Sequence, residues 1–428
     1  MTGRVALSFL LALAASGCVF REVREQQEEL DAYCIVTGTL SAQSEVQGPF
    51  IVTLSRAAAG AGPAWNGIDH FVLEGPGRWG FIAPAGTYRV SAFEDANRDF
   101  RYQPGEPFVA PGAFSPVTCK PGTRVAELTL RVPERTAGRL DETLDLASLT
   151  PRDSTSQVNA TLGQLTAAGQ VTTLADPRFS EDTARSGLWR PFDFLMDGNA
   201  GVYMLGPHDP RKTPVLFVHG INGTPASFSY LIEHLDRARF EPWVYYYPSG
   251  AHLERLAEHL EQTVAKMQLR YGVKHFAVVA HSMGGLVARG FIQRHVQRAR
   301  AGEILTFVTI STPFAGHAAA ELGVKTAPTV VRVWEDMAPG SAYLRSLYAA
   351  ALPNDPPHHL LFTFERKSTS FGPSDDGGVT VASQLAPAVQ RNAVRLYGFD
   401  DTHMGVLRDA EVSALLNRLL SQAAGPAR

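Results

Sequence analysis

The chain has 428 residues, and the usual domain size of about 100 to 250 residues predicts two folded units. Apolar residues make up 45% of the chain, as in ordinary globular proteins, so there is enough material for a core. The formal net charge is -3 and Lys and Arg form no cluster, so nothing in the sequence indicates a nucleic-acid partner.

The N-terminus combines one positive charge, at Arg4, with an apolar run from Val5 to Ala15 that is too short to span a bilayer permanently. This pattern predicts a signal peptide over residues 1–17. It ends Ala15-Ser16-Gly17-Cys18, which resembles the lipobox of bacterial lipoproteins, with Ala15 where leucine is commonest. The resemblance implies cleavage before Cys18 and lipidation of this cysteine. The alternative is an ordinary secretory peptide with an incidental cysteine.

Several acyl chains on Cys18 would anchor the protein stably, because two membrane-binding signals suffice where one does not. Val19 stands where familiar enterobacterial lipoproteins of the inner membrane carry aspartate. We therefore expect an exported lipoprotein of the outer membrane, facing the periplasm or the cell surface, with residues 18–33 as a lipidated tether. The charged stretch from Arg21 to Asp31 is predicted to be a short solvated spacer or a helix.

Two further cysteines, Cys34 and Cys119, predict one disulfide in an exported protein. The bridge would close a loop of about 85 residues and stabilise the fold by about 4 to 5 kcal/mol on chain-entropy grounds. Two separate free thiols are the alternative.

Residues 34–133 alternate short β-prone runs with clusters of Gly and Pro, which is typical of a small all-β, antiparallel sandwich domain. The segment from Phe81 to Glu106 resembles the prealbumin-like or carboxypeptidase-regulatory-like β modules of surface proteins. Residues 134–184 show weak periodicity and are predicted to be a linker, with one short helix near Ser156 to Leu165.

Four oxygen-bearing residues of this module follow the first, third, fifth and twelfth places of a calcium loop: Asp95, Asn97, Asp99 and Glu106. Phe100 stands where an EF-hand loop needs glycine, and no helical pattern flanks the segment, so an EF-hand is excluded. Two interpretations stay open: calcium binding of another kind, or a polar hairpin loop whose Asp and Asn side chains cap its own backbone.

The run from Phe276 to Ala280 is a short apolar strand that leads into Ala280-His281-Ser282-Met283-Gly284-Gly285, and an amphipathic helix follows at once. Strand, sharp turn and helix are the context of the nucleophile elbow G-x-S-x-G, with Ala280 replacing the first glycine. The motif resembles the elbow of the α/β-hydrolase superfamily, in its lipase and esterase branch. The alternative is a glycine-rich turn with an incidental serine.

The resemblance covers about residues 185–425 and implies a doubly wound, mainly parallel sheet with its site at the carboxyl ends of the strands. His219-Gly220-Ile221 follows the buried run from Pro214 to Val218 and matches the His-Gly turn of lipases. The match implies an oxyanion hole made by the backbone N–H groups of Ile221 and Met283. His219 itself is expected to be structural.

A serine nucleophile needs a histidine base and a carboxylate behind it, and in this superfamily the chain order is Ser, acid, His. His403 follows the apolar strand Val394 to Phe399, where the family's catalytic histidine lies; a surface-loop histidine is the alternative. Asp376 matches the Asp-Gly-x-Val segment that carries the family's acid. Asp375 is the runner-up, and the fallback candidates are Asp400 and Asp336.

The turn Ile310 to Gly316 resembles the Gly-Thr-Pro-His-x-Gly turn of lipases, and the insertion from His317 to Leu352 predicts a helical cap that sets acyl-chain access. The sequence as a whole predicts a serine hydrolase that cleaves carboxylic esters or lipids through an acyl-enzyme, with no metal or cofactor. An acyltransferase using the same intermediate and a catalytically silent envelope-binding lipoprotein are the competing hypotheses. The acyl substrate is not disclosed.

Overall fold

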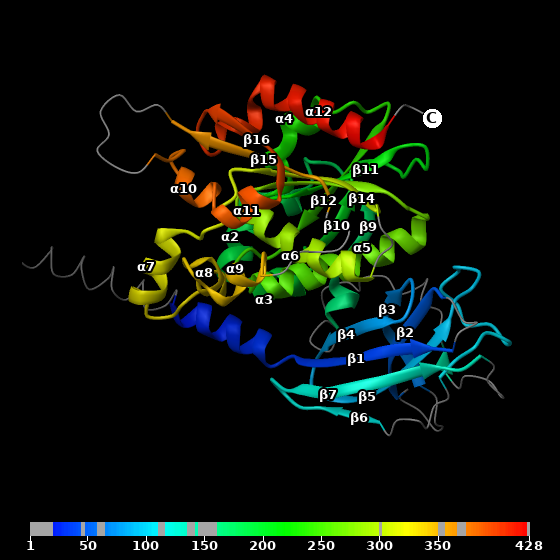
Figure 1. Cartoon of the computed structure of the whole chain (residues 1–428). Helices are drawn as coiled ribbons and strands as arrows, with labels where there is room; N and C mark the ends of the chain where they lie inside the picture. The colour runs from blue at the N-terminus through cyan, green and yellow to red at the C-terminus, as the bar shows by residue number, and fades with distance from the viewer. Residues whose placement is uncertain are drawn as a thin grey trace, which may run out of the picture.

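The structure is a computed structural model, and it describes residues 20–43, 48–57, 65–109, 116–134, 142–143, 161–298, 302–349, 356–365 and 374–425. The predicted signal peptide and Cys18 lie outside this part of the chain. A small β domain is followed by a larger domain in which helices cover a long sheet (Figure 1). Within the described ranges, no helix has the length and apolar character that crossing a bilayer requires.

The small domain contains a three-stranded sheet in the order β4-β1-β7 and a five-stranded sheet in the order β6-β5-β2-β3-β8, which share one apolar core. The strands are β1 Cys34–Ala42, β2 Phe50–Ala57, β3 Trp65–Leu73, β4 Gly77–Ala83, β5 Gly86–Glu94, β6 Val117–Cys119, β7 Arg124–Val132 and β8 Glu142–Thr143. Cys34 and Cys119 form the predicted disulfide, which joins β1 in one sheet to β6 in the other.

The strand pairing differs from the predicted antiparallel sandwich at two edges, because β1 runs parallel to β7 and β3 runs parallel to β8. Parallel neighbours need a long crossover instead of a hairpin, and the chain between β1 and β7 passes through both sheets before it returns. The local sequence of such a strand does not indicate which strand it pairs with, so the parallel pairs could not be predicted. The likeness to prealbumin-like modules remains a prediction.

The larger domain is built on an eight-stranded sheet in the order β16-β15-β14-β13-β11-β12-β10-β9, in which only β10 and β12 pair antiparallel. The strands are β9 Ala167–Val171, β10 Gly201–Met204, β11 Thr213–Val218, β12 Phe240–Tyr246, β13 Phe276–His281, β14 Ile304–Ile310, β15 His358–Phe364 and β16 Ala393–Asp400. Near-continuous burial of β11 to β14 is what a parallel sheet covered on both faces requires.

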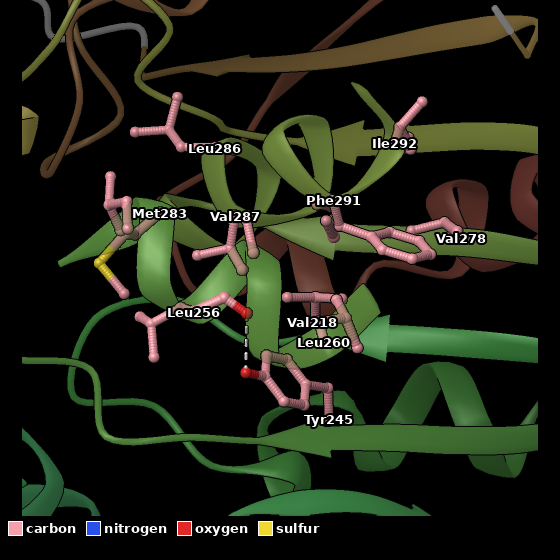
Figure 2. Packing of buried hydrophobic residues seen from close by; sticks show 14 of the residues in the cluster. Val218, Tyr245, Leu256, Leu260, Val278, Met283, Leu286, Val287, Phe291 and Ile292 are labelled. Atoms are coloured by element: carbon pink, nitrogen blue, oxygen red, sulfur yellow. Dashed lines mark hydrogen bonds between the residues drawn. The ribbon is translucent and has the colours of Figure 1, made fainter. Parts of the chain in front are cut away.

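Helices cover both faces of this sheet. The helices are α2 Glu181–Trp189, α3 Pro191–Met196, α4 Ser229–Glu233, α5 Leu253–Tyr271, α6 Met283–Arg298, α7 Ala318–Thr326, α8 Arg332–Met337, α9 Ala342–Ser346, α10 Val381–Gln384, α11 Pro387–Asn392 and α12 Ala410–Ala424, with short 3-10 turns η3 Leu162–Leu165, η4 Pro177–Phe179, η5 Pro225–Phe228 and η6 Gly405–Arg408. Alternate residues of β11 enter opposite cores: Leu216 and Val218 face α5 and α6, whereas Val215 and Phe217 face α4 and α12. Figure 2 shows the first core, where α5 and α6 side chains interlock against the strands and the Tyr245 hydroxyl donates to the Leu256 carbonyl at 3.0 Å.

Two segments outside the predicted 185–425 boundary belong to this domain's packing. Residues 167–171, predicted to be linker, form the edge strand β9, which pairs in parallel with β10. The five residues Ala-Ala-Gly-Gln-Val are too few and too small to give a strand pattern, so only the pairing reveals them. Of the predicted linker helix, only the 3-10 turn Leu162–Leu165 falls within the described residues.

The second segment is residues 20–31, which form a helix docked on the larger domain and not a solvated tether. Val23 is buried in the large core, the Gln26 side chain accepts a hydrogen bond from the Asp193 N–H at 2.9 Å, and Gln27 donates to the Val330 carbonyl at 2.9 Å. Leu30 also packs against the second core of the larger domain, and the charged composition of the stretch conceals these apolar contacts.

Candidate active site

Ser282 occupies a sharp turn between β13 and α6. Its φ is +54°, a conformation that L-residues seldom adopt, and its N–H is held by the Ile310 carbonyl at 2.8 Å. The glycines that follow are required by close approach: a Cβ on Gly284 would lie 2.3 Å from the His219 carbonyl oxygen, and one on Gly285 would lie 2.0 Å from Thr312 Oγ1. The local sequence therefore permits the strained turn that places Ser282 at the strand end, where it is 5% exposed.

Three predicted residues meet at the carboxyl edge of the sheet. Ser282 Oγ lies 2.9 Å from His403 Nε2, and His403 Nδ1 lies 2.9 Å from Asp376 Oδ2. Ser282 follows β13, Asp376 lies in the segment after β15, and His403 follows β16, so three strand ends far apart in sequence converge. The arrangement has the geometry in which a histidine accepts a serine proton while a carboxylate orients its ring.

Asp376, and not its neighbour Asp375, contacts the histidine. The Asp376 carboxylate is fully buried and accepts hydrogen bonds from Thr363 Oγ1 at 2.5 Å and Gln384 Nε2 at 3.1 Å, besides two backbone N–H groups, those of residues 378 and 379, at 2.9 and 2.6 Å. Burial alone raises the pKa of Asp376, but hydrogen bonds from His403, Thr363 and the peptide backbone outweigh burial and lower the pKa to about 2. The carboxylate is therefore ionised at neutral pH.

His281, the residue before Ser282, holds the His403 loop in place. Its Nε2 donates to the His403 carbonyl at 2.9 Å, and the two rings lie 4.7 Å apart. Burial, helped by the nearby His403, lowers the pKa of His281 to about 3, so the ring is neutral and its proton is on Nε2. The backbone N–H of His403 donates in turn to the Asp376 carbonyl at 2.8 Å.

The predicted oxyanion turn lies against the serine. A Cβ on Gly220 would lie 2.9 Å from Ser282 Cβ and 3.3 Å from Ser282 Oγ, which places the next residue, Ile221, beside the nucleophile. Among the described residues the Ile221 N–H has no hydrogen-bond acceptor. Met283 is the first residue of α6, where N–H groups lack intrahelical acceptors. Both groups are thus available to a ligand.

His219 packs beneath this turn. Its ring is buried and stacks on Tyr247 with centroids 4.2 Å apart, and burial lowers its pKa to about 4. Asn222, later in the same turn, has a φ of +52°, and its N–H donates to Ser249 Oγ at 3.0 Å. His219 Nδ1 lies 2.8 Å from the Gly220 carbonyl oxygen, so His219 supports the shape of the turn.

Several side chains of this site carry no motif of their own. Thr363 lies in β15 and Gln384 in α10, and neither position has a sequence signal that links it to Asp376. His317, at the start of α7, donates through Nε2 to the Gly378 carbonyl at 2.7 Å and so fixes the acid loop from outside. His281 could have been found, because it stands inside the elbow motif.

The described residues contain no group of three or more His, Cys, Asp or Glu side chains placed to hold a metal ion. In the loop that suggested calcium, Asp95 accepts hydrogen bonds from the Asp99 and Phe100 N–H groups, each at 3.1 Å. Asn97 donates to the Asp99 carboxylate at 3.1 Å. These contacts agree with the interpretation as a loop that caps its own backbone.

The comparisons with known proteins agree with this architecture in part. A family model described as alpha/beta hydrolase fold matches residues 213–337, which contain β11 to β14 and the elbow. This segment therefore has the α/β-hydrolase fold. No curated protein sequence matches the chain.

Solved structures with some likeness to the chain include the mature lipase BlEst2 of Bacillus licheniformis, at 17% identity over 51% of this chain and 97% of that one, with a TM-score of 0.40. A Listeria innocua protein matches at 13% identity over 49% and 94%, with a TM-score of 0.39. A structure from a study of Nitrososphaera gargenis carboxylesterases matches at 13% identity over 52% and 95%, with a TM-score of 0.37. These scores are too low to carry an inference about substrate.

The buried Asp376 predicts a stability that depends on pH. Its folded pKa of about 2 lies below the ordinary 3.8, so its stabilisation is complete above about pH 4 and is lost as the pH falls toward 2. Urea unfolding at a series of pH values should show the free-energy advantage of wild type over Asp376→Asn shrinking across this window by about 2 kcal/mol. A constant difference would contradict the account. Asp182→Asn, at an exposed site on α2, is the control.

Proposed function

We propose that the protein is a serine hydrolase of the esterase or lipase type that cleaves carboxylic esters through an acyl-enzyme. The observation that carries the proposal is the continuous hydrogen-bonded chain from Ser282 through His403 to the buried Asp376 at the carboxyl edge of the sheet. The α/β-hydrolase fold of residues 213–337 supports it, although fold alone does not define activity.

The proposed reaction has two halves. In the first, His403 Nε2 takes the Ser282 proton as Oγ attacks the ester carbonyl, and the N–H groups of Ile221 and Met283 stabilise the oxyanion. The intermediate collapses to the acyl-enzyme, and His403 passes the proton to the leaving alcohol. In the second half His403 takes a proton from water, whose oxygen attacks the acyl carbonyl, and Ser282 leaves with that proton as the acid is released.

Helices α7 to α9 form the cap in this proposal. The contact of His317 with the Gly378 carbonyl fixes the start of α7 to the loop that carries Asp376. The Tyr343 hydroxyl on α9 donates to the Leu286 carbonyl on α6 at 3.0 Å and fixes α9 to that helix. Leu322 on α7 and Met404, next to His403, are 61% and 54% exposed. Exposed apolar side chains on these segments suit a substrate with an apolar acyl group.

The first test is the turnover of chromogenic esters in a series of acyl-chain lengths. Ser282→Ala should abolish both turnover, by about 10⁴-fold or more, and labelling by a fluorophosphonate. Asp376→Asn should lower kcat by about 10³- to 10⁴-fold because the carboxylate no longer orients His403, whereas the matched Asp375→Asn should retain most activity. Serine-independent turnover would refute the proposal, and a larger loss at Asp375 would reassign the acid.

His281 provides a second test, because its role is to position and not to react. His281→Leu removes the donor to the His403 carbonyl and should lower kcat about tenfold with little change in KM. His281→Gln places an amide donor near the former Nε2 and should restore most of the loss. Equal kcat in wild type and His281→Leu, or no rescue by Gln, would show that the contact does not support catalysis.

The proposed location is the bacterial envelope, with a lipid anchor on Cys18; the lipobox-like sequence before Cys18 supports it. Cells that express the full chain should incorporate a tagged fatty acid into the protein, and the labelled protein should stay in the membrane fraction at high salt. Cys18→Ser should lose the label. A protein that is secreted unlabelled, with wild-type Cys18 in place, would contradict anchoring.

A further inference from the structure

A cavity of about 520 Å³ lies where the helix of residues 20–31, the β domain and the α/β domain meet. Its volume falls within the range of about 300 to 1,000 Å³ that is usual for small-molecule sites. The apolar part of its wall includes Leu30, Ile35, Leu162, Phe192, Leu195 and Leu256. None of the lining residues belongs to the group formed by Ser282, His403 and Asp376, so this is a separate site.

Two of the polar side chains in the wall already have carboxylate partners. Arg332 lies 2.8 Å from the Asp31 carboxylate, and His252 Nδ1 lies 3.1 Å from the Asp336 carboxylate. His259, deeper in the wall, has both ring nitrogens engaged, by Thr166 and Tyr245. Both ring nitrogens of His259 are therefore satisfied, and Arg332 and His252 already have carboxylate partners.

Arg255 on α5 differs from them. Arg255 lines the cavity and is partly buried, and its side chain makes no hydrogen bond or ion pair with any residue in the described ranges. Asp31, Glu254 and Glu258 attract it and Arg124 repels it, all from beyond ion-pair distance. Burial lowers the pKa of Arg255, yet an arginine keeps its charge, so the site holds a cation whose five hydrogen-bond donors have no direct partner among the described residues.

We propose that this cavity binds one long-chain carboxylate, such as a fatty acid, with its head group on Arg255 and its hydrocarbon chain along the apolar wall. A guanidinium matches a carboxylate by two parallel hydrogen bonds, which explains why an arginine stands here. Apolar side chains make up much of the remaining wall, which favours a hydrocarbon tail over a sugar or nucleotide. Because the site is separate from Ser282, binding does not depend on the proposed esterase activity.

The test uses the full chain carrying Ser282→Ala, a fluorescent polyene fatty acid as probe, and displacement by palmitate, hexadecanol and hexadecyl phosphate. Palmitate, at concentrations below its own critical micelle concentration, should displace the probe from one saturable site per chain. Arg255→Gln should weaken palmitate binding about ten- to hundredfold, because a charge-assisted hydrogen bond is lost. The matched control is Arg418→Gln, on the exposed side of α12, which should bind like the parent.

Two further measurements test whether a loss of binding comes from misfolding, and whether palmitate binds at the active site instead of in this cavity. Palmitate should raise the Tm of the parent but not that of Arg255→Gln, and Ala251→Phe, which fills the cavity from its wall, should abolish binding while the variant unfolds cooperatively. Wild-type protein blocked at Ser282 by a fluorophosphonate should bind as Ser282→Ala does.

Four results would overturn the inference. They are the absence of saturable binding, unchanged affinity in Arg255→Gln, equal affinity for hexadecanol, and loss of binding after the fluorophosphonate block. Tighter binding of hexadecyl phosphate than of palmitate would overturn the carboxylate assignment. If ester turnover fails but palmitate binds as described, the proposed function is refuted and this site stands.

Discussion

The structure depends most on how a fully buried negative charge is accommodated. An unpaired carboxylate in the interior would cost several kcal/mol, so Asp376 can stay ionised only if donors surround it. Thr363 from β15, Gln384 from α10, two backbone N–H groups and His403 supply them. The same contacts fix the Asp376 side chain in one orientation. The donors that stabilise its charge therefore also determine where His403 is held.

The parallel sheet makes this convergence possible. Its strand ends bring residues from three distant parts of the chain to one edge, and the two cores on either face hold those ends rigid. The strain at Ser282 is sustained by the same packing, because Gly284 and Gly285 let α6 approach the neighbouring turns more closely than any side chain would permit.

Features with a local signature could be predicted from the sequence. The elbow around Ser282, the strand before it and the loop that carries His403 all stand where their patterns indicated. The sequence favoured Asp376 over Asp375 because Asp376 directly precedes the glycine, but which of the two carboxylates contacts His403 depends on tertiary structure. Other features depend on tertiary contacts that leave no periodic pattern in the sequence. They are the contacts of Thr363 and Gln384 with Asp376, the pairing of β9, and the docking of residues 20–31.

The docked helix of residues 20–31 limits how far the protein can extend from a membrane. Only Val19 separates Cys18 from the first described helical residue, Phe20, and two extended residues span at most about 7 Å. With the proposed anchor on Cys18, the folded body would therefore lie directly against the lipid surface. Substrates would then arrive by lateral diffusion in that surface, and collision with dispersed molecules would contribute less.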